Sequence, residues 1–500
     1  MFIEAQSDPV YPKEDYKARE HQLRTALLKA QYERLNRADR SLLIVVAGID
    51  GAGKGQTINQ LNDWMDPRHI HTAAFGEPDE IEAQFPPLWR YWNAIPAKGQ
   101  TGIVFGSWYS QLLRECYRKK TRPDRIEGIG AQIRRFEAML TAEGVQIVKL
   151  WYHLSAKAQV ERIERLTSSP ETSWQVSPDD YRVAKRYDRL CDAANIALAL
   201  TDQDHAPWVV IPSADDNMRV IRTAETVLAT MKRRAIPIVA RAAMDRPRLG
   251  PVPDRLGDLD YDAHEDKHDY ERELGLLQGR LAQAVRSEKF QKRSLILAFE
   301  GQDAAGKGGA IQRIVQALDA RRYDITPVAA PAPYEQARPY LWRFWRQVPR
   351  RSRIAIFDRT WYGRVLVERV EKLTPPGLWR RAYGEINDFE RQLVENGAIV
   401  LKFWLAITQD VQLERFKERE NTPFKRYKIT PEDWRNREKW QDYAQATNEM
   451  LARTDLPHAP WYPIPANDKR YARLQVLRHI VDALEKDDAE AIGLARRRSL

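Results

Sequence analysis

One stretch of sequence is written twice in this chain, at a constant offset of 253 residues. A glycine-rich run that begins at Gly48 and contains Lys54 is matched by one that begins at Gly301 and contains Lys307 (301 − 48 = 253). The same offset aligns Trp89-Arg90-Tyr91-Trp92 with Trp342-Arg343-Phe344-Trp345, and His205-Ala206-Pro207-Trp208 with His458-Ala459-Pro460-Trp461. Because one register holds over so long a span, the chain is a tandem duplication. Each half should therefore form one copy of the same fold.

The 500 residues of the chain are too many for one ordinary domain and suit two. Between the two copies lies a segment rich in proline (Pro237, Pro247, Pro251 and Pro253) and in charged residues. Such a composition is typical of an irregular connector. We therefore expect an N-terminal domain over residues 1–245, a linker over 246–262 and a C-terminal domain over 263–500.

The glycine-rich run of the second copy predicts a phosphate-binding loop. An apolar run (295–299) precedes it, and Ile311, Ile314, Val315 and Leu318 follow at helical spacing. A strand, a glycine turn and a helix together place backbone N–H groups and a helix N-terminus around a phosphate, while the lysine reaches the outer oxygens. The expected phosphate contacts are Gly301, Ala305, Gly306, Lys307 and Gly308.

Gly308 stands where the G-x-x-x-x-G-K loop normally continues with Ser or Thr. That hydroxyl is usually a ligand of magnesium, so other oxygens must hold the ion here. Asp303, inside the loop, is the natural candidate. An incidental glycine-rich hairpin is the alternative, but the second copy of the loop argues against it.

Each copy also alternates strand and helix patterns. Amphipathic helical segments are expected over residues 20–36 and 270–288, and apolar strand-like runs over 42–47, 354–357 and 399–405. This alternation favours a parallel sheet flanked by helices, a three-layer α/β/α domain, with a ligand site at the carboxyl ends of the strands.

The positions at which the two copies differ indicate which copy is catalytic. In the second copy the run 354–357 ends in Asp358-Arg359, a carboxylate for magnesium and a guanidinium for the transferred phosphate. The first copy has Phe105-Gly106 instead. Phenylalanine cannot hold a metal ion, so we expect chemistry only in the C-terminal domain.

A basic segment of the second copy predicts a lid. It contains Arg415, Arg419, Lys425, Arg426 and Lys428, whereas the first copy retains only Arg162, opposite Arg415. Lys469 is likewise replaced by Asp216. A solvated charged face is the alternative reading, but cations lost together with the magnesium carboxylate are better explained as one lost site. The first copy keeps Asp50 and Lys54, so we expect it to bind phosphate weakly without transferring it.

Composition adds a preference for a polyanionic partner. The net charge is +10 and the isoelectric point about 9.3, which nucleic acid, an anionic membrane surface and a phosphate polymer all satisfy. The start of the sequence shows no signal-peptide pattern, and no run is long enough for a membrane span. Two cysteines make no disulfide framework. These features predict a cytoplasmic protein.

Taken together, the motifs resemble those of the polyphosphate kinase 2 family. They are Gly301-x-Asp303-x-x-Gly306-Lys307-Gly308, Asp358-Arg359-Thr360-Trp361-Tyr362-Gly363-Arg364, Pro423-x-Lys425-x-Tyr427-Lys428 and the run from Trp461 to Lys469. The tandem arrangement resembles the two-domain class, the polyphosphate:AMP phosphotransferases. Tyr427 stands where that family usually has tryptophan and Asn421 where it usually has aspartate, which bears on substrate preference more than on activity.

The resemblance implies a P-loop kinase fold similar to thymidylate kinase, with a helical lid, and transfer of a phosphoryl group from polyphosphate to AMP. It implies Mg²⁺, with Mn²⁺ as the alternative, held by Asp303 and Asp358. Lys307 and Arg359 would stabilise the phosphoryl group in transfer, and Arg364 and Glu368 would lie near the nucleotide. Arg415, Arg419, Lys425, Lys428 and Lys469 would hold polyphosphate or close the lid.

Three other functions stay open at this point. One is polyphosphate-dependent phosphorylation of a nucleoside diphosphate, ADP to ATP. Another is an ATP-dependent nucleoside monophosphate kinase, although the positive charge exceeds what one triphosphate requires. The third is a polyanion-binding protein. We expect no specific nucleic acid or membrane partner, and a homo-oligomer.

Overall fold

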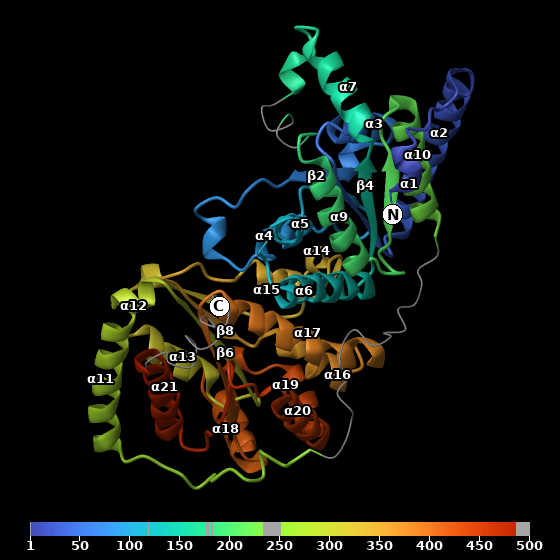
Figure 1. The fold of residues 1–500 in the computed structure, drawn as a ribbon. Helices are drawn as coiled ribbons and strands as arrows, with labels where there is room; N and C mark the ends of the chain where they lie inside the picture. Colours follow the sequence, from blue (N-terminus) through green and yellow to red (C-terminus); the bar gives the residue numbers. More distant parts are fainter. Residues whose placement is uncertain (1, 119, 177–180, 182–183, 234–251, 487–500) are drawn as a thin grey trace. The chain divides into compact units, whose positions relative to one another are not determined.

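The computed structural model describes residues 2–118, 120–176, 181, 184–233 and 252–486. The chain forms two compact units. Unit 1 comprises Met1–Glu82, Pro87–Met244 and Pro331–Arg346, and unit 2 comprises Ala83–Pro86, Asp245–Ala330 and Gln347–Leu500. Residues 234–251 lie outside the described part, so the division at 245 and 262 stays a prediction. In Figure 1 the colours run from blue to green through most of unit 1 and from yellow-green to red through most of unit 2.

Each unit contains a five-stranded parallel sheet, and the strand order is the same in both. Unit 1 has the order β2-β3-β1-β4-β5, and unit 2 has the matching order β7-β8-β6-β9-β10. The strands of unit 1 are β1 (Ser41–Gly48), β2 (Ile70–Ala74), β3 (Thr101–Phe105), β4 (Val145–His153) and β5 (Trp208–Pro212). Those of unit 2 are β6 (Ser294–Gly301), β7 (Tyr323–Pro327), β8 (Ile354–Asp358), β9 (Ala398–Ala406) and β10 (Trp461–Pro465).

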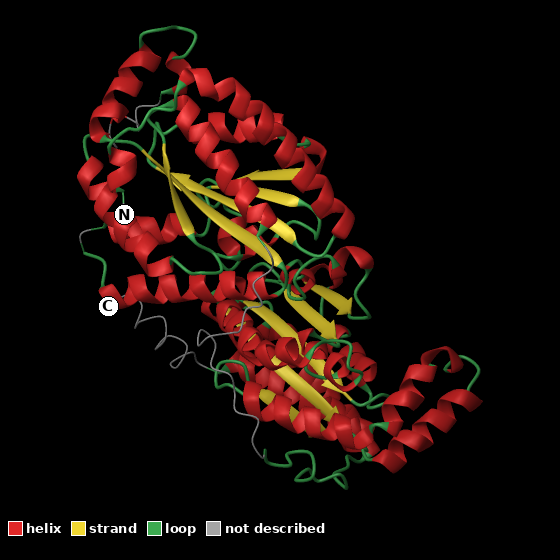
Figure 2. Ribbon diagram, turned by 90° about the vertical axis from the view of Figure 1, so that its right-hand side faces the viewer, coloured by secondary structure: helices red, strands yellow, loops and turns green. Residues whose placement is uncertain are grey.

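Helices cover both faces of each sheet, which confirms the expected α/β architecture and the tandem duplication (Figure 2). The helices of unit 1 are α1 (Ile3–Gln6), α2 (Lys13–Arg37), α3 (Lys54–Trp64), α4 (Trp89–Trp92), α5 (Tyr109–Tyr117), α6 (Pro123–Ala142), α7 (Ala156–Thr167), α9 (Tyr187–Thr201) and α10 (Asp216–Lys232). In this unit α2, α3 and α10 pack together, and α5, α6 and α9 form a second group.

The helices between residues 260 and 490 repeat this plan. They are α11 (Lys267–Ala284), α12 (Glu288–Gln291), α13 (Lys307–Val315), α14 (Pro333–Gln336), α15 (Trp342–Trp345), α16 (Val367–Val370), α17 (Pro376–Glu395), α18 (Gln409–Asn421), α19 (Pro431–Glu438), α20 (Trp440–Thr454) and α21 (Lys469–Glu485). In unit 2, α11, α13 and α21 pack together, and α16, α17 and α20 form the other group. None of the described helices is long and apolar enough to cross a membrane.

The apolar runs form the central strands, as the sequence predicts. Six residues of β1 and seven of β6 are buried, because these strands have packed helices on both faces. A core of unit 2 joins β6, β8, β9 and β10 to α11, α13 and α21. The helix expected over 270–288 ends earlier, at Ala284, because the chain turns there and the short helix α12 begins at Glu288.

In each unit a matched lysine and glutamate form a buried ion pair between the sheet and a helix. Lys402 on β9 contacts Glu390 on α17 at 2.7 Å, and the matched Lys149 contacts Glu137 at 2.9 Å; all four side chains are fully buried. Each lysine also donates to a tyrosine hydroxyl and to a backbone carbonyl. These bonds satisfy the buried charges and explain why Trp361 and Tyr362, which both donate to Glu390, recur as Trp108 and Tyr109.

Candidate active site

The strand order of unit 2 brings the glycine loop and Asp358 to the same edge of the sheet. Strand β6 lies between β8 and β9, and Phe299 on β6 is in register with Asp358 on β8. The backbone N–H of Arg359 continues this pairing and donates to the carbonyl of Phe299 at 3.0 Å. Both segments leave the carboxyl ends of adjacent parallel strands at the point where the strand order reverses, which is where open α/β sheets bind ligands.

The loop has the backbone that a phosphate cradle needs. Gly301 has φ +145°, and a side chain there would collide with the carbonyl of Leu405. Gly306 has φ +109° and caps the first turn of α13, which begins at Lys307. The ammonium of Lys307 donates to the carbonyls of Gly301 and Gln302 at 2.8 and 3.3 Å. The lysine therefore lies across the loop, next to the N–H groups at the helix start, where an anion is favoured.

Asp303 is held by two residues from other elements. Arg359 approaches one of its carboxylate oxygens at 3.1 Å, and Asn436 on α19 donates to the other at 2.9 Å. Arg359 has φ +64°, a left-handed conformation that non-glycine residues rarely adopt and that is found mostly where function demands it. Burial lowers the pKa of Arg359, but the carboxylates of Asp303, Glu300, Asp358 and Asp433 raise it more, so the net shift is upward.

The two aspartates fit a magnesium ion that shares its coordination with substrate. Mg²⁺ typically takes one or two carboxylates, keeps several waters and binds phosphate oxygens. Among the described residues, there is no cluster of three His, Cys, Asp or Glu side chains that could hold a metal by itself. Asp303 and Asp358 would thus supply the protein ligands, and the phosphates would supply the rest.

The basic segment forms α18, the short 3₁₀ turn η6 (Arg426–Lys428) and α19, and its cations lie in two different environments. Arg415 is buried and donates to the carbonyls of Ala304 and Ala305 in the loop, and to those of Ala466 and Asn467. Its observed bonds therefore brace the loop.

The other cations of this segment, together with Lys469 at the start of α21, are more exposed. Lys425 and Lys469 both face Glu418, at 2.5 and 3.7 Å, and Arg419 donates to the carbonyl of Lys428 at 3.1 Å. Burial, followed by the charge of Arg415, lowers the pKa of Lys469. Positive groups crowded around one carboxylate are suited to receive additional negative charge.

Arg364 and Glu368 lie together, as a pair. They form an ion pair at 2.9 Å, and the hydroxyl of Thr374 bonds to both, at 2.8 and 2.6 Å. Arg364 is 9% exposed, whereas the side chain of Glu368 is 28% exposed, so the carboxylate is the member of the pair nearer to solvent. A role beside the nucleotide stays a prediction.

Four further residues around Asp303 were not predicted from the sequence. The single O–H of Tyr443 lies within reach of two acceptors, the side-chain carbonyl of Asn436 at 3.2 Å and the carboxylate of Glu371 at 3.3 Å, so polar contacts connect Asp303 through Asn436 and Tyr443 to Glu371. Glu300, 6% exposed at the end of β6, accepts from Thr360 at 2.7 Å. The first copy has Val183, Leu190, Arg118 and Ala47 at these positions, and that mismatch is the signal that could have found them.

Unit 1 keeps the loop but not its surroundings. Lys54 donates to the carbonyls of Gly48 and Ile49 at 2.9 and 2.8 Å, as Lys307 does in unit 2. Gly106, at the position of Arg359, has φ +69°, and a side chain there would collide with the carbonyl of Phe75. Unit 1 therefore has no room for an arginine side chain at this position.

Comparisons with known proteins agree with this architecture. The family model described as polyphosphate kinase 2 (PPK2) matches residues 11–237 and 264–491, once in each copy. A polyphosphate:AMP phosphotransferase of Pseudomonas aeruginosa is 46% identical over 97% of this chain and 99% of its own length. One of Acinetobacter johnsonii is 42% identical over 94% of this chain and 97% of its own length.

A crystal structure of a Pseudomonas aeruginosa protein described as a polyphosphate kinase 2 covers 97% of this chain and 98% of its own, with a TM-score of 0.86 and 46% identity. The duplicated sequence, the loop and Asp358 at one sheet edge, and these full-length relatives give one conclusion. The chain belongs to the polyphosphate kinase 2 family.

Proposed function

We propose that unit 2 transfers a phosphoryl group from inorganic polyphosphate to AMP, giving ADP. The observation that supports this most is the convergence of Lys307, Asp303, Arg359 and Asp358 at the carboxyl ends of β6 and β8. Phosphoryl transfer requires positioning and charge neutralisation more than covalent chemistry, and these four side chains provide both. Relatives that match the whole length of the chain are named polyphosphate:AMP phosphotransferases.

Each residue has one task in this proposal. Lys307 moves from the loop carbonyls to the outer phosphate oxygens, and the loop N–H groups hold the inner ones. Arg359 swings between Asp303 and the phosphoryl group in transfer, a contribution that can be worth roughly 10³–10⁵ in rate. The attacking AMP phosphate is already an anion, so no side chain needs to remove a proton from it.

Mg²⁺, with Mn²⁺ as the alternative, would be held by Asp303 and Asp358 and would neutralise phosphate charge. Lys425, Lys428, Lys469 and Arg419 would bind the polyphosphate chain, and Arg415 would act mainly by holding the loop. A cytoplasmic location, a homo-oligomer and a non-catalytic first unit are further parts of the proposal.

The test is ADP formation from AMP, polyphosphate and Mg²⁺. Asp358→Asn should abolish activity, because no other side chain replaces that carboxylate at the end of β8. Asp50→Asn, the matched control at the position of Asp303 in unit 1, should leave activity unchanged. Activity that survives Asp358→Asn, or that appears only when ATP replaces polyphosphate, would refute the proposed site or the proposed donor.

A further inference from the structure

The glycine loop of unit 1 is surrounded by residues that differ together from those of unit 2. Gln56 and Thr57, in the first turn of α3, stand where unit 2 has Gly309 and Ala310. Asp216 and Arg219, in the first turn of α10, stand where unit 2 has Lys469 and Ala472. In unit 2, Ala310 and Ala472 are 2% and 4% exposed and belong to the apolar core. Unit 1 has replaced this apolar contact by a polar one.

That polar contact is centred on Asp216. One carboxylate oxygen accepts from Arg219 at 2.6 Å and from Arg162 at 2.9 Å. Both arginines are buried, with exposures of 2% and 5%.

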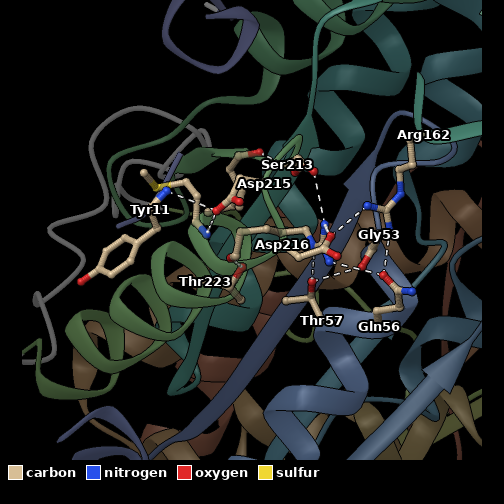
Figure 3. Close-up of polar contacts among 12 residues, drawn as sticks. Tyr11, Gly53, Gln56, Thr57, Arg162, Ser213, Asp215, Asp216 and Thr223 are labelled. Carbon is tan, nitrogen blue, oxygen red and sulfur yellow. Dashed lines mark hydrogen bonds and ion pairs between the residues drawn. The ribbon is translucent and has the colours of Figure 1, made fainter. Parts of the chain in front are cut away.

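The two arginines are also tied to the helix that follows the loop. Arg219 donates to the hydroxyl of Thr57 at 2.8 Å, and Arg162 donates to the side-chain carbonyl of Gln56 at 2.7 Å. Figure 3 shows Arg162, Asp216, Gln56 and Thr57 grouped around Gly53.

The guanidinium of Arg219 fills the space beside Gly53, whereas the space beside the matched Gly306 of unit 2 is open. A side chain added at Gly53 would lie 2.5 Å from Cζ of Arg219, whereas one added at the matched Gly306 would meet no atom within 4 Å. Arg162 also differs from its counterpart, because Arg415 donates to four backbone carbonyls and forms no ion pair with a carboxylate of the described residues. Unit 1 therefore places two guanidinium groups beside its loop, bridged by one carboxylate.

The carboxylate of Asp216 makes the same kind of bonds to the two guanidinium groups that a bound phosphate would make. Guanidinium groups recognise carboxylate and phosphate oxygens through the same charge-assisted hydrogen bonds. Burial raises the pKa of Asp216, but Arg219 and Arg162 lower it more, so the group is an anion at neutral pH. Its side chain is 58% exposed, so this position can be reached from solvent.

We propose that Asp216 is a built-in anion that occupies the Arg162–Arg219 pair, so that the loop of unit 1 does not bind a phosphate chain as it stands. Removing this one negative charge converts the pair and the loop into a binding site for an inorganic oligophosphate. The first unit is then kept closed by its own carboxylate. This proposal differs from the weak phosphate binding that the sequence predicts, and binding of tripolyphosphate by unit 1 with Asp216 in place would overturn it.

The test measures binding of tripolyphosphate to the full-length protein by calorimetry, without nucleotide, so the result does not depend on transfer activity. Lys307→Ala weakens the site of unit 2 and serves as the background. In that background Asp216→Ala should bind tripolyphosphate roughly tenfold or more tightly than the parent, the size expected for hydrogen bonds to charged groups. Adding Arg219→Ala should abolish the gain. Asp216→Asn, which keeps the shape of the side chain, should give a gain of the same direction.

Thermal unfolding supplies an independent readout. Asp216→Ala leaves two buried arginines without a counter-ion, so its melting temperature should fall, and tripolyphosphate should restore it. Asp204→Asn removes an exposed carboxylate near the start of β5, at the opposite edge of the sheet, and should show neither effect.

Three outcomes would overturn the proposal. The first is binding by the Lys307→Ala parent that disappears with Arg219→Ala, because the site would then already be open. The second is no gain with either Asp216 variant. The third is an equal gain with Asp204→Asn, which would reflect net charge alone.

Discussion

At the scale of single residues, the orientation of Asp303 depends on side chains far from it in sequence. Asn436 donates to Asp303, and the hydroxyl of Tyr443 contacts both Asn436 and Glu371. Asn436→Val introduces the residue of the first copy and removes this support. If Asp303 is the magnesium ligand that we propose, kcat/KM should fall by about 10–100-fold, the factor typical of groups that orient a metal ligand, and the Mg²⁺ concentration for half-maximal rate should rise.

Steady-state kinetics at several Mg²⁺ concentrations check this prediction. Tyr443→Phe, which removes only the hydroxyl that contacts Asn436, should give a smaller change in the same direction. An Asn436→Val enzyme with unchanged Mg²⁺ dependence would mean that Asn436 only packs α19 against the loop.

Glu300 should make stability depend on pH. Burial raises the pKa of its carboxyl above the ordinary 4.5, against hydrogen bonding by Thr360 and the charge of Lys307. The folded state therefore favours the protonated form, and the stability that this contributes is complete below pH 4.5 and is lost as pH rises through the raised pKa. Glu300→Gln should match the wild type at low pH and become progressively more stable than it above pH 4.5.

Denaturant unfolding at several pH values, with exposed Glu420→Gln as the control, checks this expectation. The same Glu300→Gln enzyme should be less active, because it lacks a negative charge that acts on Arg359. A stability difference that does not change with pH would contradict the raised pKa.

At the scale of elements, the two ends of the glycine loop should respond differently to substitution. Gly308 lies in the first turn of α13 with no atom within 4 Å of an added Cβ, so Gly308→Ala should raise stability by up to about 1 kcal/mol through helix propensity. Gly301→Ala should lower it, because the new side chain collides with the carbonyl of Leu405.

Activity separates the two roles of the loop. If Gly308 lies against phosphate, Gly308→Ala should be stable yet show a higher KM for polyphosphate. A stable Gly308→Ala enzyme with unchanged KM would show that the phosphate does not approach this turn.

The elements that the sequence predicts best are those with uniform surroundings. β6 and β9 are long apolar runs buried on both faces, and their limits differ from the expected ones by one or two residues. The helix after the loop is predicted to include Leu318, but α13 ends at Val315. Apolar spacing alone cannot distinguish a helix from the turn that follows it when both pack against the core.

The site is predictable where one motif carries several residues, and not where the fold brings distant residues together. The loop and Asp358-Arg359 follow strands directly, so their meeting at one sheet edge can be expected. Asn436 lies in a charged run of α19 that resembles any solvated helix, and its contact with Asp303 is set by how α19 folds back. Arg415 could be identified as a conspicuous cation, but its four carbonyl partners could not.

At the scale of the whole molecule, the duplication provides an internal control for each unit. The buried pairs Lys149–Glu137 and Lys402–Glu390 are alike in geometry and burial. Replacing either lysine by methionine leaves a buried carboxylate unpaired, which typically costs about 3–5 kcal/mol. Both variants should therefore be destabilised to a similar degree.

Their effects on catalysis should nevertheless differ. If phosphoryl transfer belongs to unit 2 alone and each unit has its own core, Lys402→Met should lower the temperature at which activity is lost. Lys149→Met should lower the temperature of an unfolding transition while activity persists closer to the wild-type temperature. Calorimetry and residual activity after heating, measured on the same samples with exposed Lys157→Met as the control, check both expectations. Equal loss of activity in the two variants would show that unit 2 needs a folded unit 1, and the role of the first copy would then be to support its partner.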